Sequence, residues 1–260
     1  MNTAESKDGT KIAYDKSGSG PALIYVTGAI CHRKFKPVLE DVNAFAKVFT
    51  VYCYDRRGRG DSGDNGSYAP EKELDDIEAI IKATGEKPYI YGHSSGAVLT
   101  LEAALRFPEK IRKIAVYDPP YAQDENDRKK NYAFSEDIDR LVAKKKYFGA
   151  IKYFLSGIGM PKTLIYLMPL MPGWSRIKAL APTLRYDMIL TRDLPPLERL
   201  AGMKVPVLLM YGAKNSFGFA AIVEKLAQMI PGSKVEKFAD YDHMVSAKAL
   251  VPKLRAFFEE

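Results

Sequence analysis

The chain has 260 residues, of which 47% are hydrophobic and 27% charged, and it carries a formal net charge of +7. These proportions are ordinary for a soluble globular protein, and the length allows one large α/β domain or two small ones. The two cysteines, Cys31 and Cys53, exclude a disulfide framework and favour a reducing compartment. Residues 1–9 lack the apolar core of a signal peptide, and no run of about 20 apolar residues spans a bilayer. We therefore expect a cytoplasmic protein with no membrane partner.

The positive charge invites a nucleic-acid partner, but the pattern does not favour one. Lysines are scattered, and the densest cluster, Lys144 to Lys146, lies in a helical stretch where a solvated face explains it. No nucleic-acid-binding motif accompanies the charge, so we expect no nucleic-acid partner. The charge is a weak indication of an anionic substrate.

The patterns along the chain alternate between strand and helix. Strands are predicted at 11–15, 22–26, 48–54, 89–91, 113–117, 207–211 and 234–238. Helices are predicted at 71–84, from the residues after Ser94 to about Phe107, at 219–230 and at 246–258. Several strands are continuously apolar, which is typical of strands buried on both faces. This alternation predicts a mostly parallel α/β sheet with helices on both faces.

One segment interrupts the alternation. Residues 121–202 show mostly helical patterns with many large apolar side chains, and they are too long for a simple crossover. We predict a core domain formed by residues 1–120 and 203–260, with residues 121–202 as a helical cap over the carboxyl edge of the sheet. Part of the apolar surface of the cap would roof a pocket at that edge.

The run Gly92-His93-Ser94-Ser95-Gly96 fits the G-x-S-x-G pattern of a nucleophile elbow. A serine on a strained turn between a strand and a helix needs neighbours without a Cβ two residues before and after it. The apolar strand before the run and the helical pattern after it make the match specific. Ser94 is therefore the candidate nucleophile.

The run Asp55-Arg56-Arg57-Gly58-Arg59-Gly60-Asp61-Ser62-Gly63 is a second glycine-rich loop. Its spacing fits neither the dinucleotide-binding nor the mononucleotide-binding fingerprint. We interpret it as a structural turn in which Asp55 and the arginines hold loops together.

Taken together, these features resemble the α/β-hydrolase superfamily over nearly the whole chain. The resemblance rests on an apolar strand ending in Thr27-Gly28, the loop 55–62, the elbow, the helical cap inserted after the sixth core strand, and a late Asp242-His243. The chain looks most like small esterase and lactone-hydrolase-like members in which that strand ends in an acidic residue and two prolines, here Asp118-Pro119-Pro120.

The chain has three histidines, and the catalytic base is assigned by elimination. His93 adjoins Ser94 in the elbow and is interpreted as a packing residue. His32 follows the first buried strand and could line the pocket. His243 lies between the last strand and the last helix, where this fold places its base, and it completes the order serine, acid, histidine.

The acid has two candidate positions. Family members commonly carry it after the seventh core strand, but Asn215 stands there, and an amide cannot stabilise an imidazolium by charge. Similar members carry the acid at the end of the strand before the cap, where Asp118 lies, so Asp118 is preferred and the Asn215 position is the second choice. Asp240 and Asp242 are interpreted as loop-shaping residues.

The resemblance also implies an oxyanion hole made by the backbone N–H groups of Ala29 and Ser95. Thr27 replaces the histidine usual in the family, which removes a loop-bracing side chain and leaves the backbone donors. Cys31 is interpreted as a small pocket-lining hydrophobe rather than a second nucleophile. No residue grouping has metal-ligand spacing, and we expect neither a metal nor a cofactor.

These residues predict a serine hydrolase acting on a carboxylic ester or lactone through an acyl-enzyme, with Ser94, His243 and Asp118 as the triad. Two alternatives remain open. The same site supports other chemistry on this fold, namely carbon–carbon bond hydrolysis, haloperoxidase-like reactions or a lyase. Alternatively, the chain is a non-catalytic ligand-binding member, for which Asn215 is the best support.

Overall fold

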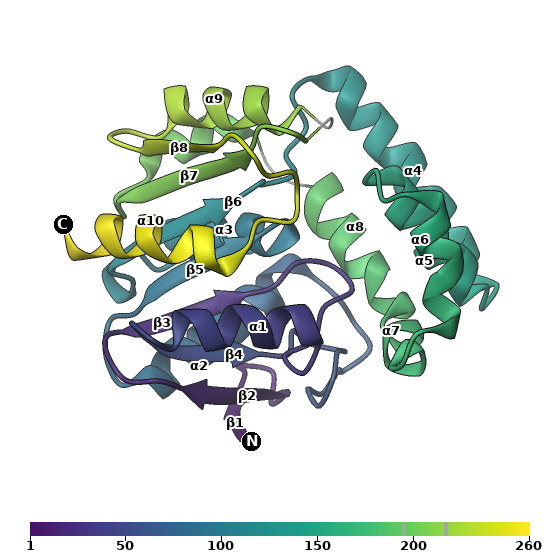
Figure 1. Cartoon of the computed structure of the whole chain (residues 1–260), viewed down its shortest axis with the longest axis horizontal. Coiled ribbons are helices and arrows are strands. Elements are labelled where there is room, and N and C mark those ends of the chain that lie inside the picture. The colour runs from purple at the N-terminus through teal and green to yellow at the C-terminus, as the bar shows by residue number, and fades with distance from the viewer. Residues whose placement is uncertain (194–195, 216–217) are drawn as a thin grey trace.

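A computed structural model of the chain describes residues 1–193, 196–215 and 218–260. Its centre is an eight-stranded sheet with the strand order β1-β2-β4-β3-β5-β6-β7-β8 (Figure 1). The strands are β1 (Asn2–Glu5), β2 (Lys11–Ser17), β3 (Ala22–Val26), β4 (Thr50–Tyr54), β5 (Tyr89–His93), β6 (Lys113–Tyr117), β7 (Val207–Gly212) and β8 (Lys234–Phe238). β1 and β2 are antiparallel additions at one edge, and the strands from β4 to β8 are parallel.

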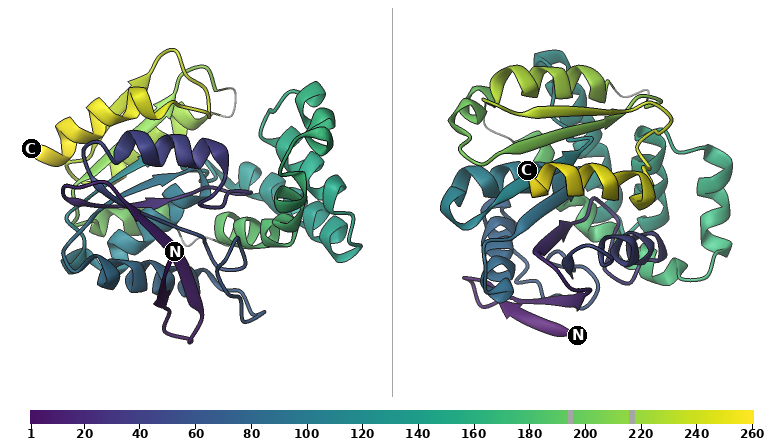
Figure 2. Two further views of the ribbon diagram at one scale, coloured as in Figure 1. Left: turned by 60° about the horizontal axis from the view of Figure 1, so that its bottom comes forward. Right: turned by 60° about the vertical axis from the view of Figure 1, so that its left-hand side comes forward.

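Alternate residues of the central strands enter two separate cores. In β3, Leu23 and Tyr25 pack on one face with α1 (Lys36–Phe45) and α10 (Ala247–Glu259). Ile24 and Val26 pack on the other face with α2 (Pro70–Thr84), α3 (Ser95–Arg106) and α9 (Phe219–Met229). Because both faces are covered, these strands have no polar face, which explains their continuous apolar runs. Figure 2 shows the two helical layers enclosing the twisted sheet.

The expected mostly parallel sheet with helices on both faces is confirmed, with some differences at its edges. β1 and α1 were not predicted, because residues 2–5 lack apolar alternation and α1 is short. The strand expected to begin at residue 48 begins at Thr50, since Val48 belongs to the turn after α1.

Between β6 and β7 the chain forms a separate group of helices, which we call the cap. Its helices are α4 (Glu125–Ala143), α5 (Tyr147–Gly157), α6 (Lys162–Leu167), α7 (Trp174–Ala179) and α8 (Leu184–Arg192). The short 3-10 turns are η1 (Pro108–Lys110) before β6, and η2 (Met168–Leu170), η3 (Ala181–Thr183) and η4 (Leu197–Gly202) after it. The cap has its own apolar core, which also takes in Ile30 from the loop after β3. It lies beyond the carboxyl ends of the parallel strands (Figure 1).

Candidate active site

Ser94 occupies a strained turn between β5 and α3. Its φ of 56° and ψ of −127° lie outside the regions that a non-glycine residue ordinarily adopts. The turn is tight, because a Cβ on Gly96 would lie 2.2 Å from the carbonyl oxygen of Val26, and one on Gly92 would lie 2.3 Å from Oγ1 of Thr100. Both glycines are therefore required by close approach, and the strain is typical of a functional position.

His243 and Asp118 form a hydrogen-bonded pair. Asp118 follows β6 directly, is fully buried, and has a φ of 47°. Its Oδ2 lies 3.0 Å from Nδ1 of His243, in the loop between β8 and α10. A carboxylate accepts hydrogen bonds, so Nδ1 carries the proton in this contact and Nε2 remains a proton acceptor. The structure therefore brings together the residues that the sequence favoured as acid and base.

Asn215 lies beside the same carboxylate and not in its place. Its Nδ2 donates to Oδ2 of Asp118 at 3.0 Å, and the backbone N–H of Gly212 donates to Oδ1 at 3.2 Å. These donors supply hydrogen bonds to a carboxylate that is fully removed from water. The amide is thus a hydrogen-bond donor to the candidate acid.

The loop that carries His243 is fixed by two side chains from neighbouring strands. Nε2 of His93 donates a hydrogen bond to the backbone carbonyl oxygen of His243 at 2.9 Å. The Tyr117 hydroxyl donates one to the backbone carbonyl oxygen of Asp242 at 2.6 Å. Burial and the nearby His243 ring lower the pKa of His93 to about 3, so His93 is neutral at pH 7. His93 packs as expected, with centroids 4.8 Å from His243, and it also positions the backbone of the candidate base.

The two acidic residues near His243 differ in their contacts. Oδ1 of Asp242 accepts from the backbone N–H of Met244 at 2.8 Å, which shapes the loop. Asp240 is exposed and lies 3.5 Å from Nζ of Lys214. The described contacts thus link Asp118, and neither of these residues, to the His243 ring.

The loop after β3 passes very close to the nucleophile. A Cβ on Gly28 would lie 3.0 Å from Cβ of Ser94, and Ala29 lines the space above Ser94. The Gly28 carbonyl accepts a hydrogen bond from Nη1 of Arg59 at 2.7 Å. Because C=O and N–H point in opposite directions across a trans peptide, this bond directs the Ala29 N–H away from Arg59. Ile30, next in the loop, has a φ of 53°.

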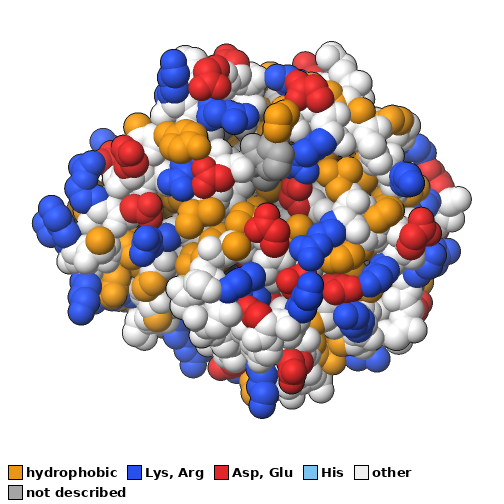
Figure 3. Space-filling model, turned by 180° about the vertical axis from the view of Figure 1, so that it is seen from behind, with side chains coloured by type: hydrophobic (Ala, Val, Ile, Leu, Met, Phe, Trp, Pro, Cys, Tyr) orange, Lys and Arg blue, Asp and Glu red, His pale blue; other side chains and the backbone are white. Residues whose placement is uncertain are grey.

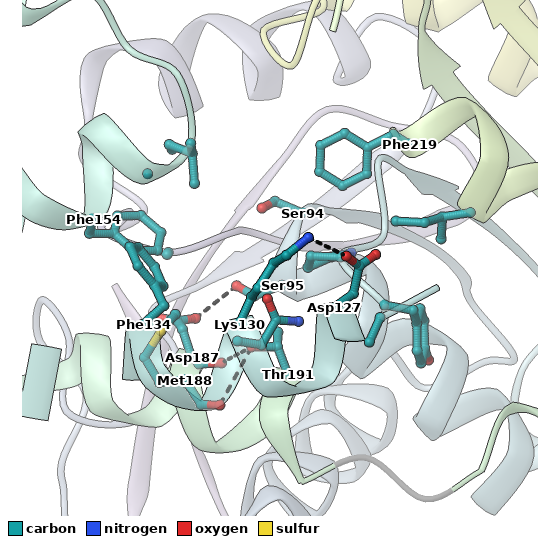
Figure 4. Close-up of a pocket in the computed structure, with 18 of the residues that line it drawn as sticks. Ser94, Ser95, Asp127, Lys130, Phe134, Phe154, Asp187, Met188, Thr191 and Phe219 are labelled. Carbon is teal, nitrogen blue, oxygen red and sulfur yellow. Dashed lines mark hydrogen bonds and ion pairs between the residues drawn. The ribbon is translucent and has the colours of Figure 1, made fainter. Parts of the chain in front are cut away.

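A buried ion cluster lies under this loop. Asp187 of α8 accepts hydrogen bonds from Nη1 of Arg56 at 2.8 Å and from Nη2 of Arg59 at 2.6 Å. It also accepts from the hydroxyl of Ser95 at 2.7 Å (Figure 4). Burial acts to raise the pKa of Asp187, but the two arginines outweigh it and lower the pKa. Arg56 is further paired with Glu73.

Asp187 was not identified from the sequence, although a signal for it was present. It lies three residues after Leu184 and three residues before Leu190 on one helical face, and all three side chains are buried. An acidic residue on the apolar face of a helix requires a buried cation as its partner. The arginines of the 55–63 loop are such cations, and the expected role of that loop in holding segments together is confirmed by these bonds and by those of Asp55.

Two cavities meet at Ser94 and His243. The larger has a volume of about 550 Å³ and is lined by cap residues together with Phe219 and Ile222 of α9. Figure 4 shows the rings of Phe134, Phe154 and Phe219 around Ser94, with Lys130 and Asp127 of α4 on the same wall. The smaller, of about 160 Å³, lies on the side of α1 and is mostly apolar. Ala29, Ser94 and His243 belong to the walls of both.

The remaining candidates fall beside these cavities. Cys31 lines the smaller cavity, and burial raises the pKa of its thiol to about 11, which keeps it protonated. His32 is buried against Phe35, with ring centroids 6.1 Å apart, and is absent from the walls of both cavities. The expectation that His32 lines the pocket is therefore wrong for both of these cavities.

Two further features are absent from the part of the chain that the structure describes. Within residues 1–193, 196–215 and 218–260, no three His, Cys, Asp or Glu side chains are grouped so as to hold a metal ion. In the same ranges, no helix has the length and apolar character needed to cross a membrane.

Comparison with known proteins places the chain in a family. Residues 23–250 match the model of the alpha/beta hydrolase family, and the chain belongs to that family. The crystal structure of an alpha/beta hydrolase from Sphaerobacter thermophilus DSM 20745 superposes with a TM-score of 0.87 and 36% identity, covering 99% of this chain and 100% of that one.

Two curated relatives are more distant. The chain is 25% identical over 247 residues to the 2-(acetamidomethylene)succinate hydrolase of Mesorhizobium japonicum, covering 89% of this chain and 84% of the relative. It is 33% identical over 139 residues to the uncharacterized hydrolase YraK of Bacillus subtilis (strain 168), covering 51% of this chain and 50% of the relative. The latter match therefore spans half of each protein.

Proposed function

We propose that this chain is a serine hydrolase that cleaves a carboxylic ester or a lactone through an acyl-enzyme. The observation that carries the proposal is the 3.0 Å contact between His243 and Asp118, with His243 and Ser94 in the walls of the same two cavities. A non-catalytic ligand-binding role would be favoured if Asp118 lay out of hydrogen-bond range of His243. The two side chains are within that range, which supports the catalytic role.

In the acylation step, Oγ of Ser94 attacks the carbonyl carbon of the substrate while Nε2 of His243 takes the hydroxyl proton. The imidazolium that forms is stabilised through its Nδ1–H by the carboxylate of Asp118. The tetrahedral oxyanion accepts hydrogen bonds from the N–H groups of Ala29 and Ser95. When it collapses, the bond to the alcohol oxygen breaks and His243 returns its proton to that oxygen.

In the deacylation step, water from the cavity attacks the acyl carbon, and His243 takes a proton from the water. The second tetrahedral intermediate expels Oγ of Ser94, which regains its proton from His243. The products are a carboxylic acid and an alcohol, or a single hydroxy acid when the substrate is a lactone.

The cavities indicate how a substrate would fit. Because Ala29 and Ser94 separate a chamber of about 550 Å³ from one of about 160 Å³, an ester bound at Ser94 has unequal space on its two sides. We propose a substrate with one bulky and one compact apolar part, the compact part lying toward α1.

The test uses a panel of p-nitrophenyl esters and a fluorophosphonate probe. We expect the wild-type chain to release p-nitrophenol with a burst of acyl-enzyme, and the probe to label it at Ser94. Ser94→Ala should lose both the label and the turnover. Ser175→Ala, at an exposed serine of α7, is the matched control and should retain both.

Other outcomes would oppose the proposal. Full esterase turnover in Ser94→Ala would overturn the mechanism. Labelling of Ser94 without hydrolysis of any ester would favour carbon–carbon hydrolase, haloperoxidase-like or lyase chemistry at the same site. The absence of both labelling and turnover would favour a ligand-binding role.

A further inference from the structure

The positive charge of the chain is concentrated in the cap. Residues 140–186 contain nine lysines and arginines and no aspartate or glutamate. The net charge of the whole chain is +7, so this segment accounts for all of its excess positive charge. The basic residues are Arg140, Lys144, Lys145, Lys146, Lys152, Lys162, Arg176, Lys178 and Arg185.

The same part of the cap exposes large apolar side chains. We call residues 162–178, which form α6, η2 and α7, the cap edge. Leu170 is 81% exposed, and four further residues of the cap edge are also among the exposed large hydrophobic side chains of the chain, namely Leu164, Tyr166, Leu167 and Met171. A cluster of this kind is a mark of an interaction site.

The apolar and basic side chains are interleaved. Nζ of Lys152 lies 5.2 Å from the ring centroid of Tyr166. Trp174 packs edge-on against Phe148, with centroids 5.5 Å apart, which joins α7 to the first turn of α5, the helix that follows Lys144, Lys145 and Lys146 in the chain. Figure 3, in which the cap lies on the left, shows lysine and arginine side chains along its outer rim with hydrophobic side chains between them.

We propose that the cap edge docks on an anionic lipid surface. Leucine, methionine and tryptophan side chains flanked by lysines are the features by which a protein lies in the interfacial layer of a membrane. The basic residues would be attracted to anionic headgroups, and the protruding apolar side chains would gain by leaving water. The expectation of no membrane partner rested on the absence of a spanning run, and docking of this kind requires none.

The charge and the exposed apolar side chains of the cap edge argue against two other partners, a second copy of this chain and a nucleic acid. A second copy of this chain would bring the same acid-free segment against the cap edge, and like charges would repel. A nucleic acid would satisfy the basic residues but would leave Leu167, Leu170 and Met171 without an apolar partner. An anionic lipid surface complements both the basic residues and the exposed apolar side chains.

The cap edge also adjoins the active site. Met168 of η2 and Ile177 of α7 line the smaller cavity that reaches Ser94. Docking would therefore place the cap wall of this cavity next to lipid. The inference goes beyond the proposed hydrolysis and does not depend on it, because docking is measured without turnover.

The test measures binding of the full chain to vesicles. One set is pure phosphatidylcholine, and the other contains phosphatidylglycerol in addition. We expect co-sedimentation with the anionic vesicles only, weakening as the salt concentration rises. Trp174 is the only tryptophan of the chain, so a blue shift of its emission on vesicle addition reports on the cap edge directly.

Surface variants separate the contributions of charge and apolar contact. Lys162→Gln with Lys178→Gln should weaken partitioning to anionic vesicles roughly 30-fold. Leu167→Ser with Leu170→Ser should abolish the blue shift of Trp174. The matched controls are Lys47→Gln with Lys248→Gln, and Leu39→Ser, at exposed positions outside the cap, and they should bind as the wild type does.

Three results would overturn the proposal. One is a wild-type chain that stays in the supernatant with both kinds of vesicle. Another is a pair of cap-edge variants that bind as well as their controls. The third is a different occupant, shown by a concentration-dependent dimer that Leu167→Ser with Leu170→Ser dissociates, or by tighter binding to a DNA duplex than to anionic vesicles.

Discussion

Oδ2 of Asp187 lies 2.6 Å from Nη2 of Arg59, and this contact joins cap helix α8 to the loop that follows β4. Arg59 in turn donates a hydrogen bond to the Gly28 carbonyl oxygen. Oδ1 of Asp187 accepts a hydrogen bond from the Ser95 hydroxyl. One cap carboxylate thus contacts the supports of both candidate oxyanion-hole residues. The placement of the cap and the geometry of the candidate oxyanion hole are therefore linked.

We expect Asp187→Asn to lower kcat while changing KM little. The neutral amide holds Arg59 and Ser95 more weakly, so the Ala29 and Ser95 N–H groups lose their alignment toward the oxyanion. Loss of one such donor costs about 3 kcal/mol in a known case, so a fall in kcat of about 10- to 100-fold is expected from misalignment. Steady-state kinetics on the best p-nitrophenyl ester measures it.

Asp76→Asn is the matched control for this prediction. Asp76 is fully buried and accepts two hydrogen bonds from Arg57, in the same loop, at 2.8 and 2.6 Å. Its loss should lower thermal stability as Asp187→Asn does and leave kcat near the wild-type value. Equal kcat values for the two variants would show that Asp187 has only a structural role.

Asp118→Asn should reduce turnover far more than Asn215→Ala. An amide at 118 cannot stabilise the imidazolium by charge, and the corresponding change in a serine protease lowers kcat by about 10⁴. Asn215→Ala removes one donor to the carboxylate and leaves the Gly212 N–H in place, so a loss of about tenfold is expected. Rates of fluorophosphonate labelling provide the comparison.

The order of these two effects is the critical result. If Asn215→Ala lost as much turnover as Asp118→Asn, the assignment of Asp118 as the acid would be wrong. Circular dichroism of both variants would exclude unfolding as the cause.

His93 should make the fold sensitive to acid. Its pKa is lowered from 6.5 to about 3 in the folded chain, so the unfolded chain binds the proton more readily between these values. Stability from this residue is fully present above pH 6.5 and is lost as the pH falls, by up to about 1.4 kcal/mol per pH unit. Urea unfolding at several pH values between 7 and 4 measures the slope.

His93→Gln supplies the comparison for that slope. The glutamine Nε2 can still donate to the His243 carbonyl, but the side chain does not titrate. The variant should lose less stability than the wild type between pH 6.5 and 4. An unchanged slope would locate the acid sensitivity elsewhere.

Gly96→Ala should destabilise the chain by about 3 kcal/mol or more, because the new Cβ would lie 2.2 Å from a backbone oxygen of β3, which cannot move aside. Gly202→Ala is the control, since a Cβ there would meet no atom within 4 Å. Thermal unfolding of both variants measures the difference. A well-folded and fully active Gly96→Ala would mean that the elbow is looser than described.

The amino-acid sequence was enough to predict most of the sheet, most of the helices that pack on it and the candidate nucleophile. The reason is that these features depend on neighbours in the chain. Burial on both faces makes a strand continuously apolar, and the crowded turn at Ser94 requires glycines two residues away on either side. The exceptions, β1 and α1, are short elements whose formation depends on tertiary packing.

The contacts between side chains that are distant in the chain could be read from the tertiary structure alone. Asp118 and the Asn215 position were both candidates for the catalytic acid. In the fold the two side chains lie side by side, and the Asn215 amide donates a hydrogen bond to the Asp118 carboxylate. Asp187 lies 128 residues from Arg59 and contacts it only because the cap folds back over the sheet. Hydrogen bonds between distant segments leave no periodicity in the sequence, so their partners become visible only when the chain is folded.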